Sequence, residues 1–310
     1  MNSAMRIGAF GDWLKVATVF AAAGAIAAWL SILHPLFDIV SHARVPIAAL
    51  LAAFALLHLP ARRLRWAAAA LVAAMVAVAP AWDFVAPRRA SPAEGAKVRV
   101  LFHNAWMRNE DPSRVIALAR AASPDVVALI EVRRDWHPAL DELADLYPYR
   151  VMEPRYGETV IFSKTPLEPF DAPGAGASIV FADIQRPSGP ALRLAVTHFT
   201  RPWPWDDPGA QREQLTRFGR AWRANGEPDL VVGDFNGAPF SPPLQALSEQ
   251  TGLRPVVGAG GTWPTFLPAI FRLPIDNALV GVRVSAATRD VRGNTGSDHA
   301  PVVIELTLTD

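Results

Sequence analysis

Three long apolar segments lie within the first 90 residues and constrain the fold of this chain more than any other feature. They cover residues 16–35, 45–59 and 66–85. A helix crosses the hydrocarbon core of a bilayer with about 20 residues, so the first and third segments are long enough, whereas the second has only 15. Alanine-rich helices that are apolar on every side need a covering that water cannot provide. Residues 1–90 therefore predict an all-α membrane anchor of three transmembrane helices, with the lipid bilayer contacting residues 16–85.

A cleaved signal peptide is the alternative explanation of the first segment, because "AAAGAIAA" has the small residues of a cleavage site. Two further apolar segments follow it, which favours membrane spans. Basic residues in short connections remain in the cytoplasm and set the orientation. Five are expected on the cytoplasmic side and three on the other: Arg6, Lys15, Arg62, Arg63 and Arg65 against Arg44, Arg88 and Arg89. The sequence thus predicts a multi-pass membrane protein with the rest of the chain outside the cytoplasm, in the periplasm if the cell is Gram-negative.

A linker rich in Pro, Ala and Gly over residues 91–97 separates the anchor from a region of different pattern. Over residues 98–310, short β-rich runs such as "DVVALIEV" and "DLVVGDFN" alternate with amphipathic stretches such as "QREQLTRFGRAWRAN". We expect about eight to ten strands and three or four helices there. This pattern predicts one α/β domain, a sandwich with its sheets inside and its helices outside.

Polar residues of similar chemistry close six of the expected strands. They are Asn104, Glu131, His198, Asp234 with Asn236, Asp276, and Asp298 with His299. Each has an ordinary explanation by itself. Asn104 could cap the helix that follows it. Glu131 could pair with Arg133 or Arg134, and Asp234 could simply form a turn. Six such strand ends together favour a shared site.

The order of these motifs resembles the endonuclease/exonuclease/phosphatase superfamily, also called deoxyribonuclease-I-like. The resemblance covers residues 98–307, and its motifs are "HN" at 103–104, "IE" at 130–131, "TH" at 197–198, "GDFN" at 233–236, "PID" at 274–276 and "SDH" at 297–299. It implies a four-layer α/β sandwich and a metal-dependent hydrolase of phosphoric esters. With its anchor, the chain is similar to a membrane-bound bacterial branch of that superfamily.

The resemblance also implies a metal site, and the chemistry agrees with it. A phosphodiester resists hydrolysis because its negative charge repels the nucleophile, so catalysis needs charge neutralisation, positioning and proton transfer. Asn104, Glu131 and Asp298 would be the metal ligands. Hard oxygen ligands in a chain without cysteine favour Mg²⁺, with Mn²⁺ as a substitute.

Five further residues would act on the substrate. Asp234 would accept the proton of the attacking water, and Asn236 would donate to the phosphate or hold that water. Residues two apart in a strand share a face, so both side chains are expected in one pocket. His299 would contact the phosphate, oriented by Asp276, whose charge raises the pKa of the imidazole. His198 would protonate the leaving group or hold a phosphate oxygen.

Two positions depart from the superfamily pattern. Many nucleases carry an acidic residue two positions after the motif asparagine, where this chain has Trp106. That departure weakens the case for a second metal ion. Asn277 follows Asp276, where an aromatic residue or histidine is common.

The class of phosphoester stays open. After Lys97 the chain has 21 Lys and Arg against 25 Asp and Glu, a net charge of −4, whereas non-specific nucleic-acid enzymes usually present a basic surface. Six arginines could form a local patch, although a solvated face is the more ordinary explanation: Arg133, Arg134, Arg155, Arg201, Arg212 and Arg217. The substrate is either nucleic acid or a lipid or sugar phosphate.

Five aromatic residues are expected near the mouth of the site: Trp203, Trp205, Trp263, Phe266 and Phe271. They could stack bases, line an apolar pocket or lie at the membrane surface. Core packing is the alternative for Trp263 and Phe266. An aromatic rim on a membrane-tethered domain favours a lipid-linked phosphoester slightly.

Two other functional classes are compatible with the chain. A catalytically silent binding module would keep the same fold, but it would not need a proton acceptor beside a metal site. A transport or assembly subunit would use the helices, but these lack the interior charges of an ion or substrate path. Nothing in the sequence indicates an obligate protein partner.

Overall fold

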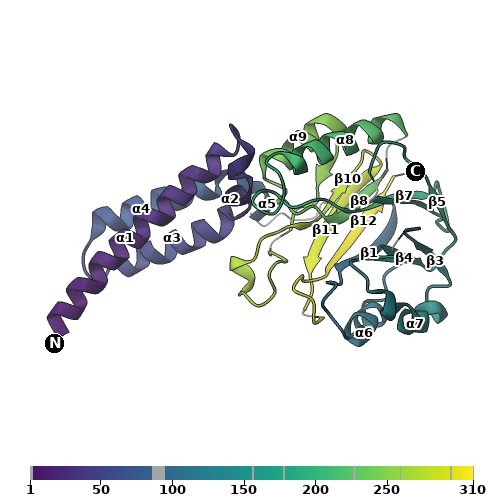
Figure 1. Ribbon diagram of the computed structural model, residues 1–310, viewed down its shortest axis with the longest axis horizontal. Helices are drawn as coiled ribbons and strands as arrows, with labels where there is room; N and C mark the ends of the chain where they lie inside the picture. The colour runs from purple at the N-terminus through teal and green to yellow at the C-terminus, as the bar shows by residue number, and fades with distance from the viewer. Residues whose placement is uncertain are drawn as a thin grey trace.

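The computed structural model describes residues 3–85, 95–155, 157–176, 179–225, 228–258, 260–293 and 295–309. It has two parts, an elongated bundle of helices and a rounded α/β domain (Figure 1). The chain begins at the end of the bundle that points away from the α/β domain.

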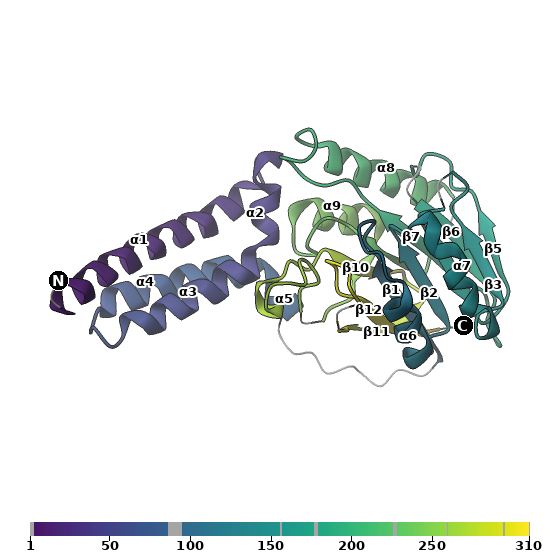
Figure 2. The same ribbon diagram turned by 60° about the horizontal axis from the view of Figure 1, so that its bottom comes forward.

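Helices α1, α3 and α4 lie side by side in the bundle, and short helices join it to the α/β domain (Figures 1 and 2). The bounds are α1 Ser3–Leu30, η1 Pro35–Phe37, α2 Asp38–His42, α3 Arg44–His58, α4 Leu64–Val78, η2 Ala79–Ala81 and α5 Trp82–Val85, where η is a 3₁₀ helix. Phe10–Leu30 and Leu64–Val85 are long and apolar enough to cross a membrane. Pro35–His42 with Arg44–His58, bent by 57°, makes a third span if the pair counts as one. The structure thus has a helix in each of the three apolar segments, of which the second is short, and the three membrane crossings stay a prediction.

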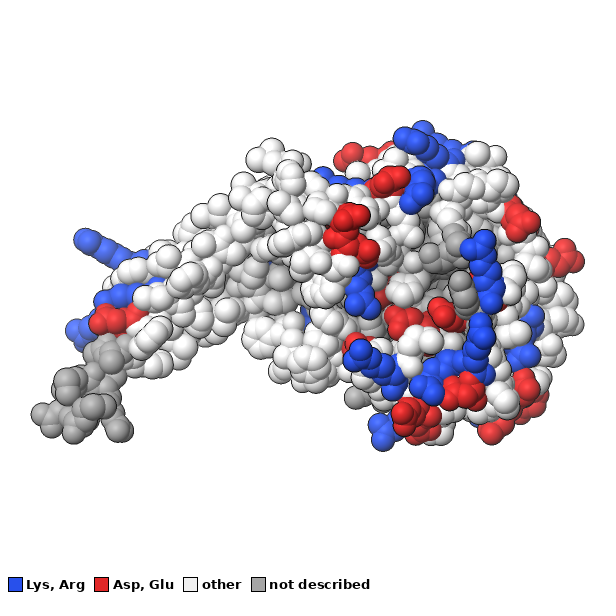
Figure 3. Space-filling model, viewed as in Figure 1, with Lys and Arg blue, Asp and Glu red and all other residues white. Residues whose placement is uncertain are grey.

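Small residues bring the three helices of the bundle together. The residues buried between the helices are Ala25, Ala48, Leu51, Ala55, Ala70, Ala74 and Ala77. Small side chains let helix backbones approach closely. Larger apolar side chains such as Phe20, Leu56 and Leu71 are exposed on the outside. Figure 3 shows few charges along the bundle except at its far end, so its surface suits contact with lipid.

The α/β domain contains two six-stranded sheets. The first has the order β11-β12-β1-β2-β4-β3, with bounds β1 Ala96–Asn104, β2 Val126–Ile130, β3 Tyr149–Met152, β4 Val160–Ser163, β11 Val284–Val291 and β12 Val302–Leu308. The second has the order β5-β6-β7-β8-β10-β9, with bounds β5 Leu167–Phe170, β6 Ile179–Ile184, β7 Leu192–His198, β8 Leu230–Asp234, β9 Arg254–Pro255 and β10 Asp276–Val280. The described residues thus form twelve strands rather than eight to ten, because several edge strands are too short to show a period of two.

Helices cover the outer face of each sheet. The first sheet is covered by α6 Ser113–Ala122, η3 Arg134–Trp136, α7 His137–Leu140 and η4 Asp141–Asp145, and the second by α8 Ala210–Ala224 and α9 Pro242–Thr251. A central core of aliphatic side chains lies between the sheets. The order helix, sheet, sheet, helix confirms the predicted four-layer α/β sandwich.

The expected linker over residues 91–97 lies mostly outside the described residues, which stop at Val85 and resume at Gly95. Strand β1 begins at Ala96, two residues before the expected start of the domain. A difference of that size is usual for the end of a strand.

The faces that the two sheets turn toward each other carry the central core. Side chains alternate between the two faces of a strand, and this alternation positions the polar residues. In β8, Leu230 and Val232 lie in the core between the sheets, so the next inward position is Asp234. The same period of two brings Asn104 in β1, His198 in β7 and Asp276 in β10 to inward positions at strand ends. The inter-sheet core therefore ends in a polar layer.

Candidate active site

Strand register aligns three of the polar residues across the second sheet. Asp234 at the end of β8 pairs with His198 at the end of the parallel strand β7. On its other side, Asp234 pairs with Asp276 at the start of the antiparallel strand β10. The three predicted residues therefore lie next to one another in one row.

The first sheet supplies the residues that face this row. Asn104 Nδ2 donates to Glu131 Oε1 at 3.0 Å and lies 3.3 Å from Asp234 Oδ2, so it links the two sheets. The nitrogen His198 Nε2 lies 3.5 Å from Glu131 Oε1 and 3.9 Å from Asp234 Oδ2. These contacts bring together two acids, an amide and a histidine from four strand ends.

The "SDH" segment closes the site from the third side. Ser297 Oγ donates to the backbone oxygen of Asn104 at 2.8 Å and accepts from the backbone nitrogen of His299 at 3.0 Å. The serine thereby holds the segment against the end of β1. Asp298 Oδ2 accepts from Trp263 Nε1 at 3.0 Å.

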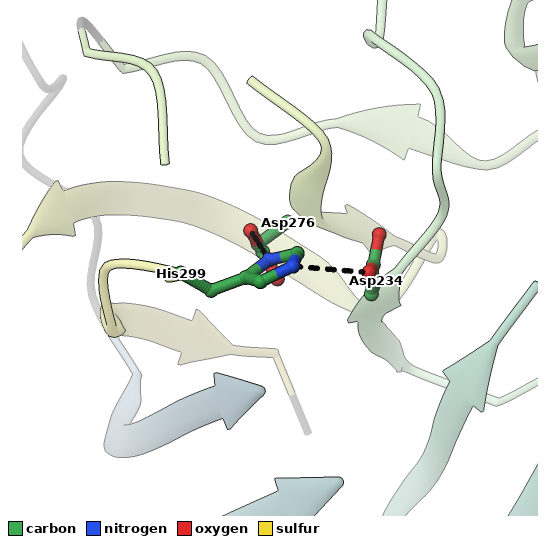
Figure 4. Close-up of side chains that lie close together, drawn as sticks. All are labelled: Asp234, Asp276 and His299. Carbon is green, nitrogen blue, oxygen red and sulfur yellow. Dashed lines mark hydrogen bonds and ion pairs between the residues drawn. The ribbon is translucent and has the colours of Figure 1, made fainter. Parts of the chain in front are cut away.

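His299 and Asp276 form a buried hydrogen-bonded pair. His299 Nδ1 lies 2.8 Å from Asp276 Oδ2, while Nε2 lies 3.8 Å from Asp234 Oδ2 (Figure 4). Burial alone would lower the pKa of His299, but the carboxylates of Asp276, Asp234 and Asp298 outweigh it and raise the pKa to about 10. The imidazole is therefore a cation at neutral pH, as the sequence predicts for a group that contacts phosphate.

Asp234 is almost fully buried, and its environment opposes ionisation. Burial, together with the charge of Asp276, raises the pKa of the Asp234 carboxyl to about 6, against the lowering effects of His299 and His198. Its Oδ1 accepts from the backbone nitrogen of Asn236 at 2.7 Å. A carboxylate whose pKa lies this near neutrality can both accept and release a proton.

A cavity of about 540 Å³ opens onto this cluster. Six of the eight predicted site residues line it: Glu131, His198, Asp234, Asn236, Asp298 and His299. The other two, Asn104 and Asp276, are fully buried behind Glu131 and His299. All eight predicted residues thus belong to one connected cluster, although their catalytic roles stay predictions.

The ordinary explanation of Asn104 does not hold, and one of the two expected partners of Glu131 pairs elsewhere. Asn104 does not cap α6, because its Oδ1 accepts from the backbone nitrogen of Trp106 and Asp111 Oδ1 accepts from Ser113 at the start of that helix. Glu131 Oε2 accepts from the backbone nitrogen of Met107. The guanidinium of Arg133 instead binds Asp135.

The backbone geometry of Asn236 differs from the one expected. Strand β8 ends at Asp234, and Asn236 has a φ of 47° in the turn that follows. Its Nδ2 donates to the backbone oxygen of Phe199 at 2.9 Å. Asn236 therefore reaches the cavity through a turn closed by Asp234, not through the alternation of a strand.

The residues present could hold a metal ion in two ways. Asp234, Asp276 and His299 offer atoms that lie within 4.8 Å of one another. A metal ion there would compete with the hydrogen bond between His299 Nδ1 and Asp276 Oδ2, which disfavours that set. The predicted set consists of the hard oxygens of Asn104, Glu131 and Asp298, and Asp298 Oδ1 is buried without a hydrogen-bond partner within the described part of the chain. These oxygens fit Mg²⁺ or Mn²⁺.

Several other residues that line the cavity were not predicted: Ile39, His42, Met107, Arg108, Glu158, Leu273 and Ile275. Apart from Ile275, which lies within "PID", no short motif marks them. Ile39 and His42 come from α2 in the helical part, and only the tertiary structure brings that helix to the cavity.

The aromatic residues expected near the mouth are divided. Trp205 and Trp263 line the cavity. Phe266 is 81% exposed, which excludes core packing for that residue. Three of the six arginines expected to form a patch are paired with acids, Arg133 with Asp135, Arg212 with Asp38 and Arg217 with Glu213, whereas Arg201 lines the cavity.

Solved structures show the same fold. A variant of beta toxin from Staphylococcus aureus with bound magnesium ions is 16% identical, covers 69% of this chain and 100% of its own, and has a TM-score of 0.56. TDP2 from D. rerio in complex with a single-stranded DNA product is 17% identical over 68% of this chain and 99% of its own, with a TM-score of 0.54. The endonuclease/exonuclease/phosphatase from Beutenbergia cavernae is 20% identical over 68% of this chain and 72% of its own, with a TM-score of 0.52.

At sequence identities this low, the likeness to these structures shows the fold alone. No curated protein matches the sequence. A model of the Endonuclease/Exonuclease/phosphatase family matches residues 101–299, which are more than half of the chain and contain all eight residues of the cluster. The chain therefore belongs to the endonuclease/exonuclease/phosphatase family, a family of phosphoric ester hydrolases.

Proposed function

We propose that the protein is a membrane-anchored, metal-dependent phosphoesterase that hydrolyses a phosphodiester or phosphomonoester by attack of water. The observation that carries the proposal is the meeting of Asp234, His299 and Glu131 in one cavity. An acid of raised pKa, a buried imidazolium and a further carboxylate are what proton transfer and phosphate binding need. A binding surface alone would not require them.

Each of the site residues has a separate role in the proposed reaction. The oxygen of the attacking water bonds to phosphorus while the bond to the leaving oxygen breaks. Asp234 takes a proton from that water. The imidazolium of His299, held by Asp276, stabilises the growing charge on the phosphoryl oxygens. His198 has the more open side chain of the two histidines, 31% exposed, and protonates the leaving oxygen. A metal ion held by Asn104, Glu131 and Asp298 would neutralise phosphoryl charge.

We place the helical bundle in a bacterial inner membrane and the α/β domain in the periplasm. The lengths of the helices and the basic residues at the far end of the bundle support this arrangement. A nucleic-acid substrate has the support of the DNA-bound TDP2 structure, and the anchor brings lipid or sugar phosphates within reach.

The test is hydrolysis of bis-p-nitrophenyl phosphate by the full chain in detergent, with Mg²⁺ and with a chelator. Asp234→Asn keeps the shape of the strand end and removes the proton acceptor, so turnover should fall by about 10²–10⁴-fold. Glu131→Gln should weaken metal binding, so part of its lost activity should return at high Mg²⁺ concentration.

Asp145→Asn is the matched control, because this exposed acid forms only a surface ion pair with Arg120 and should keep full turnover. Full hydrolysis by Asp234→Asn, or full activity with the chelator, would contradict the proposed chemistry.

A further inference from the structure

Helix α2 of the helical part forms part of the wall of the catalytic cavity. Ile39 and His42 line the same cavity as Asp234 and His299. A methyl group added to Gly237, the residue after Asn236, would lie 3.6 Å from His42 Nε2. The α/β domain alone therefore does not complete the cavity.

His42 has no structural partner that explains its position. The side chain is fully buried, and neither ring nitrogen has a hydrogen-bond partner within the described part of the chain. Burying an imidazole without a partner costs free energy, and such groups usually meet a ligand or water. A polar group of a bound substrate in the cavity would satisfy the ring.

The contact between α2 and the α/β domain is a built interface. Arg212 Nε in α8 donates to Asp38 Oδ2 at 2.8 Å, and the Asp38 side chain is only 3% exposed. Arg212 also donates to the backbone oxygen of Ser31. Near α5, the rings of Phe84 and Phe240 pack with their centres 5.8 Å apart. These contacts hold the cavity against the bundle.

The loop between Trp263 and Leu273 forms a second wall and reaches toward the bundle. Both of these residues line the cavity, and the turn η5 Ala269–Phe271 in this loop contacts α3. In Figure 2 the loop lies at the junction of the two parts. Phe266 and Ile270 are exposed there, beside helices whose surface suits lipid. The cavity thus opens between α2 and this apolar loop, at the end of the bundle that adjoins the α/β domain.

We propose that the substrate is a lipid phosphoester drawn from the leaflet that faces the α/β domain. This inference rests on the proposed phosphoesterase function. The phosphate lies at Asp234 and His299, the apolar chains lie along Ile39, Trp263 and Leu273, and His42 bonds to oxygens of the headgroup.

The charges and the shape of the cavity favour lipid over nucleic acid. The chain after Lys97 has a net charge of −4, and Arg133, Arg212 and Arg217 are paired with acids. Figure 3 shows basic side chains along the rim of the hollow in the α/β domain and acidic side chains both inside that rim and around it. Helix α2 also forms one side of the cavity with the apolar side chain of Ile39.

The test uses the full chain in unilamellar vesicles of phosphatidylethanolamine that contain phosphatidic acid, phosphatidylglycerol or sphingomyelin. The same preparation is given bis-p-nitrophenyl phosphate and single-stranded DNA, with Mg²⁺ throughout. We expect one of the lipids to be hydrolysed with a kcat/KM well above that for DNA. If DNA or the soluble ester is hydrolysed and none of the three lipids is, the lipid inference is overturned and the proposed phosphoesterase function stands. No turnover of any substrate would overturn the proposed function and this inference with it.

Variants of α2 provide the second readout, the ratio of lipid to soluble-ester turnover. Ile39→Ser and His42→Ala should each lower this ratio about 10-fold, the usual effect of losing one contact in a binding pocket. Phe266→Ser should lower it as well, and this residue is too exposed for the change to unfold the protein. Val282→Ser is the control, since Val282 is similarly exposed but lies in the turn between β10 and β11, outside the loop that reaches the bundle. An unchanged ratio in all three variants would overturn the inference.

Discussion

Backbone strain gathers at the cavity. Five non-glycine residues among those described have a positive φ, and three of them line the cavity: Trp106 at 65°, Glu131 at 52° and Asn236 at 47°. This left-handed conformation costs a residue with a side chain about 1–2 kcal/mol. Each of the three follows a strand of the inter-sheet core, so the strand packing holds the strain. Strained residues at a cavity are typical of functional sites.

The pair of His299 and Asp276 predicts how stability depends on pH. The folded-state pKa of His299, about 10, lies above the ordinary value of 6.5. The folded state therefore binds the proton more tightly, and the stabilisation is fully present below pH 6.5 and is lost as the pH rises through 10. His299→Asn removes this term, so the gap in unfolding temperature between wild type and variant should be large at pH 6 and small above pH 10.

Thermal unfolding of the full chain in detergent measures this gap. His137→Asn is the control, because His137 forms no ion pair within the described part of the chain. A gap that stays constant or grows with pH would show that Asp276 does not hold the proton on His299.

At the scale of elements, the glycine of the "GDFN" motif has a structural reason. A Cβ added to Gly233 in β8 would lie 2.2 Å from the backbone oxygen of Thr197 in β7. That distance is far below contact, and the backbone of a paired strand cannot move aside cheaply. Gly233 therefore lets β7 and β8 pair closely where His198 and Asp234 end the strands.

Gly233→Ala should lower the free energy of unfolding by about 1–3 kcal/mol, the usual cost of overpacking. Gly293→Ala is the matched control, since a Cβ there would meet nothing within 4 Å. Chemical denaturation of the full chain measures both. Equal stability of the two variants would mean that β7 and β8 are less tightly paired than the structure shows.

The sequence predicts those elements whose signal is local. Alternation in "DLVVGDFN" locates β8 and its acid, and the helical period of residues 210–224 locates α8. The two-residue strand β9 has no such signal. Nor does the placement of α2, because the pair of Asp38 and Arg212 joins residues 174 positions apart. Ile39 and His42 were missed for that reason, while the eight residues predicted from the motifs lie in one cluster.

At the scale of the whole molecule, the bundle and the cluster of predicted site residues are physically connected. Arg289 is buried between them, with its guanidinium carbon 5.6 Å from the centre of the Phe84 ring of α5. Its Nη2 donates to the backbone oxygen of Asp276 at 3.0 Å. The residue that orients His299 is thus held by a side chain that packs on the bundle.

The arrangement of the bundle also predicts the topology in the membrane. The connection between α3 and α4 carries Arg62 and Arg63, and it lies at the end of the bundle away from the α/β domain (Figure 1). Lys97 lies in β1, on the opposite side of the apolar helices. Basic connections stay in the cytoplasm, so alkaline phosphatase should be active when fused after Lys97 and inactive after Arg63. β-Galactosidase, which works only in the cytoplasm, should give the opposite result. The reverse pattern would put the catalytic cavity on the cytoplasmic leaflet, and the lipid that reaches Ile39 and His42 would then come from that side.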